Sequence, residues 1–151
     1  MNGAEALLKT LVDAGIEICF ANPGTSEMQL VSAIGNTDAM RPVLCLFEGV
    51  VTGAADGYAR MTDKPAATLL HLGSGFSNSL ANLHNARRAG SPVVNIVGDH
   101  ASYHLQFDAP LTSNLQAIAR WGSHHVEIAH SPDDLSEAGA RTVQASLRGN
   151  G

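Results

Sequence analysis

The sequence is poor in charged residues, in aromatic residues and in cysteine. Only 15% of its 151 residues are charged and 5% are aromatic, whereas 44% are hydrophobic. Soluble domains carry about 25% charged residues, so the scarcity of charge predicts a homo-oligomer with covered faces. The only two cysteines, Cys19 and Cys45, each lie in a short apolar run. That position is typical of reduced, buried thiols and favours a cytoplasmic protein over one with a disulfide.

Features of several protein classes are also missing. The net charge is -5, and the arginines are scattered rather than gathered in a basic stripe, so we expect no nucleic-acid partner. The segment from Met1 to Lys9 has no basic start followed by an apolar stretch, and no apolar run approaches the roughly 18 residues of a membrane helix. We therefore expect a protein that is neither secreted nor bound to a membrane.

The common catalytic motifs are absent as well. The sequence has no Gly-x-Ser-x-Gly, no phosphate-binding Gly-x-x-x-x-Gly-Lys-Ser/Thr and no paired carboxylates. Gly73-Ser74-Gly75 begins like a dinucleotide fingerprint, but Asn78 replaces the third glycine, which favours a simple strand-to-helix turn. His100, His104, His124 and His125 have no partners at the spacing of a tetrahedral site, so we expect no metal bound by this chain.

What is present is a regular alternation of helical and strand patterns. Apolar residues at helical spacing run from Ala6 to Val12. The expected order after them is strand 16–21, helix 27–35 capped by Thr25 or Ser26, strand 42–47, helix 49–61, strand 66–71, helix 75–88 and strand 92–97. Uninterrupted apolar strands separated by helices predict an α/β fold, a three-layer open parallel sheet with helices on both faces.

The rest of the chain continues the pattern less regularly. A polar loop from 98 to 112 follows the fourth strand at the sheet edge where ligands bind in such folds. A helix over 114–121, a short segment 124–128 and a helix that is capped by Ser131 or Asp133 and runs to about Ala145 come next. We interpret residues 1–151 as one domain, and since its final helix should lead to another strand, we expect it to end before its last strand.

Glu48 is the first candidate for chemistry. It lies inside the run Leu46-Phe47-Glu48-Gly49-Val50-Val51, where a predicted buried strand turns directly into a helix. Burial penalises the charged form of a carboxylate, and a helix N-terminus offers N–H donors, so such a group can exchange a proton near neutral pH. On spacing alone, an ordinary acidic residue of a first helical turn explains the same pattern.

Three segments favour the functional interpretation. They are Asn22-Pro23-Gly24-Thr25-Ser26-Glu27, Glu48 followed by Gly53-Ala54-Ala55-Asp56-Gly57-Tyr58-Ala59-Arg60, and His71-Leu72-Gly73-Ser74-Gly75-Phe76-Ser77-Asn78. Together they resemble the pyrimidine-binding (Pyr) domain of thiamine-diphosphate enzymes of the acetolactate synthase and benzoylformate decarboxylase group. The resemblance covers nearly the whole chain in order, and its most specific part is Glu48 followed by the segment from Ala55 to Arg60.

The resemblance implies roles for individual residues. Glu48 would hydrogen-bond the cofactor's aminopyrimidine and favour the imino tautomer that takes the thiazolium proton, giving the ylide that attacks a 2-oxo acid. His71 would assist proton transfer, and Thr25 and Ser26 would contact the substrate. Pro23, Gly24, Gly73, Ser74 and Asn78 would lie near the pyrimidine. Asn78, Asn82 and Asn85 share one helix face, which we interpret as either a subunit contact or a solvated face.

The resemblance also implies that this chain holds half a site. In the family, Mg²⁺ and the diphosphate are held by a second domain with Gly-Asp-Gly, and Gly98-Asp99-His100 lacks the last glycine. The site would be shared across a dimer or tetramer, or with a diphosphate-binding partner subunit. Decarboxylase and carboligase activity, and the identity of the 2-oxo acid, stay open. The alternatives are a non-catalytic interaction subunit that completes a partner's site and a nucleotide-binding regulatory domain.

Overall fold

Four parallel strands form one sheet in the computed structural model, which describes the backbone of residues 1–150 and the side chains of residues 1–148. The strands are β1 (Ile18–Asn22), β2 (Arg41–Leu44), β3 (Ala66–His71) and β4 (Val93–Gly98), and they are paired in the order β2-β1-β3-β4. Cys19 lies opposite Ala67, which lies opposite Val94. All four strands run the same way, so their carboxyl ends share one edge of the sheet.

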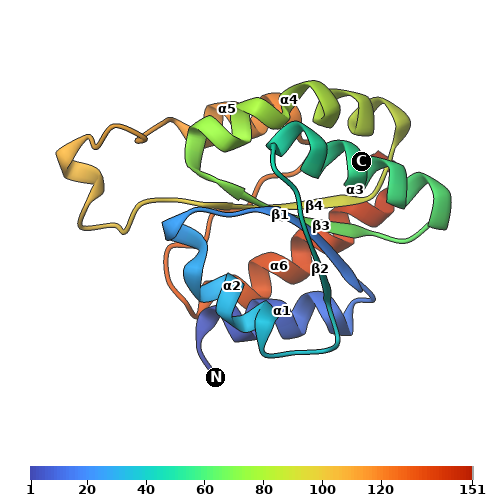
Figure 1. Ribbon diagram of the computed structural model, residues 1–151, viewed down its shortest axis with the longest axis horizontal. Helices are drawn as coiled ribbons and strands as arrows, with labels where there is room; N and C mark the ends of the chain where they lie inside the picture. The colour runs from blue at the N-terminus through green and yellow to red at the C-terminus, as the bar shows by residue number, and fades with distance from the viewer. Residues whose placement is uncertain (151) are drawn as a thin grey trace.

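Helices cover both faces of this sheet (Figure 1). One face carries α1 (Gly3–Asp13), α2 (Met28–Gly35) and α6 (Asp134–Ala145), and the other carries α3 (Glu48–Thr62), α4 (Leu72–Ala89) and α5 (Leu115–Gly122). Three short helices complete the described chain: η1 (Thr25–Glu27), η2 (Leu105–Phe107) and η3 (Ser146–Asn150). The predicted three-layer open parallel sheet is confirmed.

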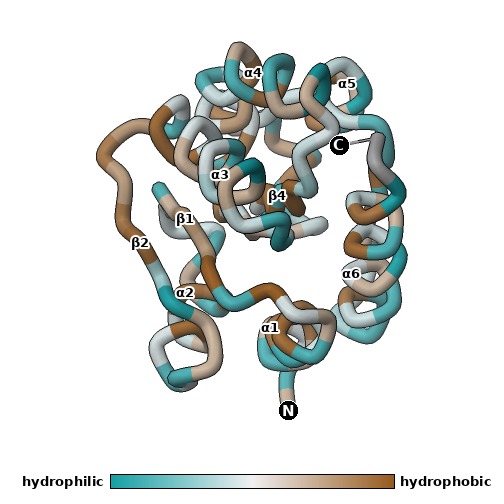
Figure 2. The backbone as a smooth tube through the Cα atoms, turned by 90° about the vertical axis from the view of Figure 1, so that its right-hand side faces the viewer, coloured by the Kyte–Doolittle hydropathy of each residue, from teal (hydrophilic) through white to brown (hydrophobic). Residues whose placement is uncertain are grey.

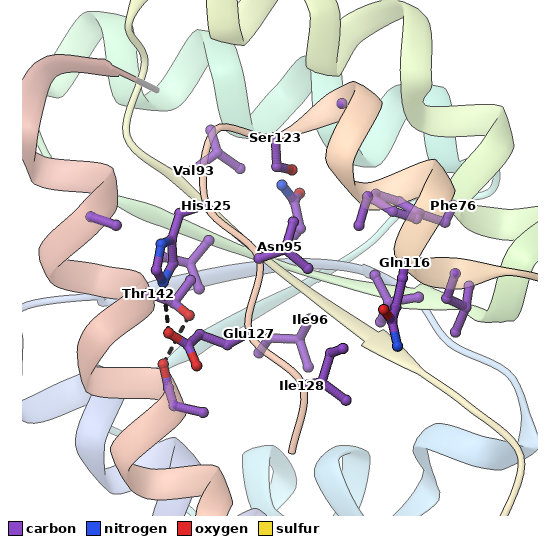
Figure 3. Close-up of a pocket in the computed structure, with 18 of the residues that line it drawn as sticks. Phe76, Val93, Asn95, Ile96, Gln116, Ser123, His125, Glu127, Ile128 and Thr142 are labelled. Carbon is purple, nitrogen blue, oxygen red and sulfur yellow. Dashed lines mark hydrogen bonds and ion pairs between the residues drawn. The ribbon is translucent and has the colours of Figure 1, made fainter. Parts of the chain in front are cut away.

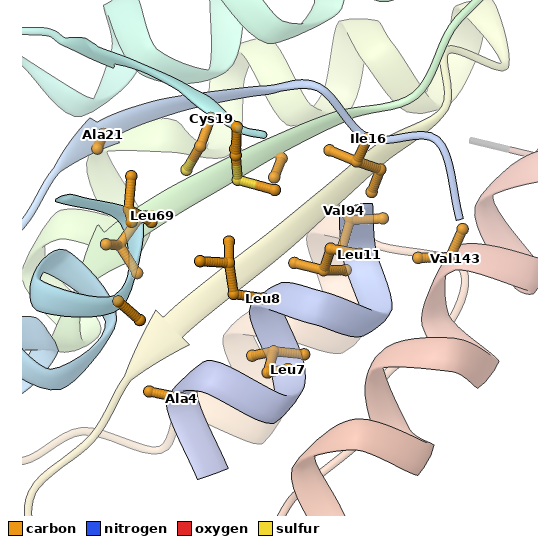
Figure 4. Close-up of a cluster of buried hydrophobic side chains, with 14 residues drawn as sticks. Ala4, Leu7, Leu8, Leu11, Ile16, Cys19, Ala21, Leu69, Val94 and Val143 are labelled. Atoms are coloured by element: carbon orange, nitrogen blue, oxygen red, sulfur yellow. The ribbon is translucent and has the colours of Figure 1, made fainter. Parts of the chain in front are cut away.

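The two faces of the sheet bury separate apolar clusters. Leu7, Leu8 and Leu11 of α1 pack against Cys19 and Leu69 on one face (Figure 4). Because side chains alternate along a strand, the neighbouring positions point the other way. Phe20 and Leu70 accordingly pack against Val51 and Phe76 on the second face.

The two cysteines are free and buried, as the apolar runs around them predict. Burial raises the pKa of the Cys19 thiol to about 12. Burial also raises the pKa of Cys45, against a smaller opposing effect from its backbone hydrogen bond with Ala21. Neither thiol is therefore poised to react as a thiolate at neutral pH.

The expectation of a second buried strand from Pro42 to Phe47 is wrong. β2 pairs with β1 alone and ends at Leu44, and Leu44 and Leu46 are 71% and 92% exposed. Figure 2 shows this hydrophobic stretch running along the outside of the molecule toward α3. An apolar run predicts a strand, but it does not say whether that strand lies at the centre or at the edge of the sheet.

The predicted side-chain caps of two helices are also wrong. Neither Thr25 nor Ser26 caps α2, since the chain makes the η1 turn first and the Glu27 side chain accepts a hydrogen bond from the Gly24 N–H. At α6, a carboxylate oxygen of Asp134 accepts the N–H groups of His130 and Ser131 instead. In both places, an acidic side chain within the helical turn reaches back to the N–H groups that precede it.

The polar segment from 98 to 112 leaves the carboxyl end of β4 as the long loop that projects at the left of Figure 1. Apart from η2, it has no regular structure. Among the residues that the structure describes, no helix is long and apolar enough to cross a membrane.

Candidate functional site

The candidate site lies at the carboxyl edge of the sheet, where the segments that follow β1, β2 and β3 come together. Glu27 follows β1, Glu48 follows β2, and His71 is the last residue of β3. Open parallel sheets bind their ligands at this edge because the loops there diverge to opposite faces.

Glu48 is the first residue of α3, and its carboxylate lies over the first turn of α4. Asn78 Nδ2 donates to Glu48 Oε2 at 3.0 Å, and a Cβ placed on Gly75 would lie 3.0 Å from Oε1. The side chain is half-buried, so the prediction that Glu48 is withdrawn from water overstates its burial. β2 is an edge strand, and the end of an edge strand has neighbours on one side only.

The packing of α3 against α4 fixes the position of Glu48. Asn82 Nδ2 donates to the Gly49 carbonyl at 2.6 Å, and Thr52 Oγ1 donates to the Ser79 carbonyl at 3.3 Å. Asn78 and Asn82 thus hydrogen-bond to the first turn of α3, although Asn78 is exposed, and the interpretation of the row as a solvated face or a subunit contact stays a prediction. Asn85, the third member of the row, is exposed.

His71 sits at a strained junction between strand and helix. Leu72 has φ +49°, in the left-handed region that residues other than glycine seldom adopt, and α4 begins there rather than at the predicted Gly75. Such strain costs about 1–3 kcal/mol and persists where the surroundings hold it in place. Leu72 is buried. The abrupt turn keeps His71 at the sheet edge instead of releasing it into a loop.

The fully buried acid at this edge is Glu27, which the sequence analysis did not single out. Its exposed fraction is 0%. Glu27 Oε2 accepts the Gly24 N–H at 2.7 Å and lies 2.9 Å from His71 Nδ1, which is also 3.1 Å from Ser26 Oγ. Spacing contains one indication of this arrangement, because Glu27 is three residues after Gly24, as in a capping box.

Two glycines leave room for this cluster. A Cβ on Gly98, the last residue of β4, would overlap Glu27 Oε1, and a Cβ on Gly24 would overlap the His71 ring. The Gly98-Asp99-His100 segment therefore has a packing role at its glycine. Residues from the ends of β1, β3 and β4 close around one carboxyl group.

The other predicted site residues are distributed around this cluster. Thr25 and Ser74 are exposed, Pro23 and Gly24 are half-buried, and Gly73 is buried. A Cβ on Gly73 would overlap the Ser113 side chain, so this glycine permits close contact with the segment before α5. The structure brings Gly24, Ser26 and His71 together, and it brings Glu48 and Asn78 together; the roles assigned to these residues stay predictions.

The Ala55-Asp56-Gly57-Tyr58-Ala59-Arg60 segment, the most specific part of the resemblance, has a structural role in α3. Ala55 and Ala59 are buried, and Asp56 accepts two hydrogen bonds from Arg60 and one of 2.5 Å from Ser91. Burial alone would raise the pKa of Asp56, but the Arg60 and Ser91 hydrogen bonds outweigh it and the pKa is lowered. The motif thus fastens α3 to the segment before β4.

A large cavity lies elsewhere in the molecule. It has a volume of about 790 Å³ and separates β4 from the extended segment 123–129, between α5 and α6 (Figure 3). His125 and Glu127 on its wall are 2.8 Å apart, and Arg141 also pairs with Glu127. Neither Glu48 nor His71 lines it. β4, which lines it, is an edge strand whose outer edge pairs with no strand within residues 1–150.

The histidines do not gather into a metal site within the described part of the chain. The His100 and His104 rings are 5.3 Å apart in the projecting loop, whereas His124 accepts a hydrogen bond from Arg87. No group of three histidine, cysteine or acidic residues there has a geometry that would hold a metal ion.

Comparison with known proteins identifies a family that matches most of this chain. Residues 1–127 match the family model described as "Thiamine pyrophosphate enzyme, N-terminal TPP binding domain". The chain is 55% identical over 150 residues to "Putative acetolactate synthase large subunit IlvX" of Mycobacterium tuberculosis. It is 28% identical over 135 residues to the acetolactate synthase large subunit of Buchnera aphidicola. These alignments cover 99% and 89% of this chain but 29% and 24% of the relatives, so the chain spans less than a third of their length.

Solved structures agree on the fold. The thiamine diphosphate-dependent 4-hydroxybenzoylformate decarboxylase of Rhodococcus jostii RHA1 matches with a TM-score of 0.90 at 25% identity, over 97% of this chain and 28% of that one. Benzoylformate decarboxylase of Polynucleobacter necessarius matches with a TM-score of 0.84 at 24% identity, over 94% and 27% of the two chains. The chain belongs to the family of N-terminal, thiamine diphosphate-binding domains of thiamine diphosphate enzymes.

Proposed function

We propose that this chain binds the aminopyrimidine of thiamine diphosphate in a 2-oxo-acid decarboxylase or carboligase, with Glu48 as the activating acid. One observation carries the proposal. Glu48 Oε2 is held by Asn78, while Oε1 accepts no hydrogen bond from any described residue. A carboxylate with one oxygen anchored and the other available fits a ring nitrogen that must gain and lose a proton.

The chain's own groups then have distinct tasks. Thiamine diphosphate supplies a nucleophilic carbon and an electron sink for cleavage next to a carbonyl group. Glu48 Oε1 would share a proton with the pyrimidine ring nitrogen, while Asn78 keeps the carboxylate over α4. Pro23, Gly24, Gly73 and Ser74 are proposed to line the ring. A positioned acid or base of this kind is worth about 10²–10⁴ in rate.

The substrate side of the site is proposed to include Thr25, Ser26 and His71. Thr25 and Ser26 form the turn after β1, and Ser26 Oγ lies 3.1 Å from His71 Nδ1. The hydroxyl groups would orient the carboxylate of a 2-oxo acid, and His71 would move a proton at its carbonyl carbon or oxygen. Because the relatives include acetolactate synthases and the similar structures include decarboxylases, the proposal covers both carboligation and decarboxylation.

A partner surface is proposed to complete the site. Leu44, Leu46, Phe47 and Val50 flank Glu48 and are at least 50% exposed. A cluster of this kind marks an interface, and its burial would also remove Glu48 from water. The partner, either a second copy of the protein or a diphosphate-binding subunit, would hold Mg²⁺ and the diphosphate.

The test measures hydrogen–deuterium exchange at C2 of thiamine diphosphate bound to the assembled enzyme. The reaction is quenched with acid, and NMR gives the extent of exchange. Glu48→Gln keeps the size of the side chain but cannot take the proton, so exchange should slow at least about 10²-fold. Asp38→Asn, which changes an exposed carboxylate of the same chain, is the matched control. Exchange at the wild-type rate in Glu48→Gln would remove Glu48 from the mechanism.

A second candidate function is a non-catalytic subunit that only completes a partner's site. The exposed apolar residues beside Glu48 favour it equally, because they need a partner and not a reaction. Sedimentation with and without a diphosphate-binding partner, with thiamine diphosphate binding measured in parallel, separates the two. Assembly and cofactor binding that are the same for wild type and Glu48→Gln, together with unchanged turnover, would favour the interaction subunit.

A further inference from the structure

We propose that Glu27 is a positioning residue that fixes the proton and the ring orientation of His71. The functional value of this arrangement rests on the proposed role of His71, but the arrangement itself does not. Glu27 comes from the turn after β1 and His71 from the end of β3, so the contact joins two neighbouring strands at the candidate site.

The burial of Glu27 demands an explanation. Transferring a carboxyl group from water to a protein interior is costly unless it is fully hydrogen-bonded. Glu27 is 0% exposed, and its Oε1 has no hydrogen-bond partner among the described residues. Capping the Gly24 N–H would require no such burial, because residues that cap helical turns are commonly exposed. The contact with His71 is the remaining interaction of the buried carboxyl group.

The geometry around Oε2 decides the direction of that hydrogen bond. Oε2 already accepts the Gly24 N–H at 2.7 Å, and a carboxylate has acceptors only. For an ionised Glu27, His71 Nδ1, which lies 2.9 Å from Oε2, is therefore the donor. Ser26 Oγ, 3.1 Å from the same nitrogen, can donate or accept and so imposes no choice. Glu27 alone selects the tautomer.

The ring is also restricted from its face. A Cβ on Gly24 would overlap Cε1, Nδ1 and Cγ of His71, so the backbone of the turn lies against the imidazole. Gly98 closes the far side of Glu27 in the same way. The carboxyl group cannot swing away from the histidine without moving the end of β1 or of β4.

The consequence is a defined second nitrogen. With the proton on Nδ1, the neutral imidazole of His71 carries a lone pair on Nε2, which makes no hydrogen bond with the described residues. His71 is 23% exposed, in contrast to Glu27. A histidine held in this way presents a proton acceptor of fixed direction, the arrangement in which a buried acid orients a histidine without reacting itself.

The first measurement uses the unmodified chain. Selective ¹⁵N labelling of histidine, with His71 assigned by its loss in His71→Gln, gives the tautomer from the two ring nitrogen shifts. We expect the Nδ1–H form of neutral His71 to exceed 90% of the population. A predominant Nε2–H form in the wild-type chain would overturn the inference without any change to the Glu27 pocket.

Two variants then separate Glu27 from Ser26. Glu27→Met fills the pocket with an unbranched apolar side chain, so the Ser26 hydroxyl becomes the only polar partner of Nδ1 and the Nε2–H form should rise at least fivefold. Ser26→Ala should leave the tautomer unchanged. Loss of the Nδ1–H preference in Ser26→Ala, or its retention in a folded Glu27→Met, would contradict the proposal; should Glu27→Met not fold, the wild-type and Ser26→Ala measurements still decide.

The tautomer does not depend on the cofactor, so this result stands apart from the exchange assay on Glu48. In the assembled enzyme, loss of turnover in Glu27→Met with unchanged C2 exchange would place the effect at His71. Loss of exchange together with turnover would instead indicate general disruption of the site and count against a positioning role.

Discussion

Glu27 and Glu48 lie at the same edge of the sheet, yet their surroundings are opposite. Glu48 lies at the end of an edge strand, half-buried and beside exposed apolar side chains. Glu27 lies between the ends of β1 and β4 and is completely enclosed. The comparison teaches that burial of an acid follows the place of its strand in the sheet, not the apolar character of its own segment. These surroundings fit the two proposed roles, in which Glu27 holds His71 and Glu48 meets a partner and the cofactor.

The largest expected effect comes from closing the Glu27 pocket. Gly98→Ala places a methyl group onto Glu27 Oε1, and the carboxyl group that must move is fully buried. Overpacking a filled interior costs about 1–3 kcal/mol, and we expect the upper end of that range in the free energy of unfolding. Urea denaturation followed by circular dichroism measures it. A loss below about 0.5 kcal/mol would mean that the pocket is loose.

A third carboxylate, Asp56, sharpens the comparison because its partners are known. Asp56→Asn removes the charge that binds Arg60 and Ser91, and since hydrogen bonds to charged groups contribute about 1.5–3 kcal/mol, we expect a loss of about 2 kcal/mol. The pKa of Asp56 is lowered in the folded chain, so its contribution is present above the unfolded pKa and is lost as the pH falls through the folded pKa.

The measurement is the free energy of unfolding as a function of pH for both proteins. The difference between wild type and Asp56→Asn should be full at neutral pH and should shrink in acid. A difference that stays constant down to the lowest pH would show that packing, not charge, holds Asp56.

The matched test at the other acid is Gly75→Ala. The added Cβ would lie 3.0 Å from Glu48 Oε1, but the end of this half-buried side chain can shift, and alanine is better than glycine within a helix by about 0.5–1 kcal/mol. We expect unchanged or slightly higher stability, together with slower C2 exchange because the carboxylate is displaced. Destabilisation as large as that of Gly98→Ala would abolish the distinction between the two sites.

The smallest effect on stability is expected from Glu48→Gln itself. The group is half-buried, and a glutamine oxygen can still accept the Asn78 hydrogen bond, so the free energy of unfolding should change by no more than about 0.5 kcal/mol. Thermal unfolding checks this value. A much larger loss would give Glu48 a structural role and would complicate the exchange assay proposed for it.

Several elements follow directly from local sequence patterns. β3 spans the predicted residues 66–71, α5 lies within one residue of the predicted 114–121, and α1 contains the predicted helical run from Ala6 to Val12. Glu48 begins a helix as its sequence context indicates. The hydrophobic period and the capping residues depend only on nearby positions in the sequence, so they can be identified without knowledge of the fold.

Other features depend on residues that are distant in the sequence. The enclosure of Glu27 requires Gly98, which lies 71 residues later in the sequence. The exposure of β2 depends on which strand lies at the edge of the sheet. From the sequence, Asp56 and Arg60 look like an ion pair on the surface of one helix. The structure adds a hydrogen bond to Asp56 from Ser91, which lies in another segment. The periodicity of the sequence does not predict such contacts between distant segments.

The sequence by itself determined the order of helices and strands, the parallel α/β class and the placement of Glu48 and His71 at one edge, because side-chain period and strand direction are local. Only the tertiary structure decided that Glu27 is fully buried and that Glu48 stays partly exposed to water. Burial depends on how the ends of separate strands close around a side chain, and that closure exists only once β1, β3 and β4 are side by side.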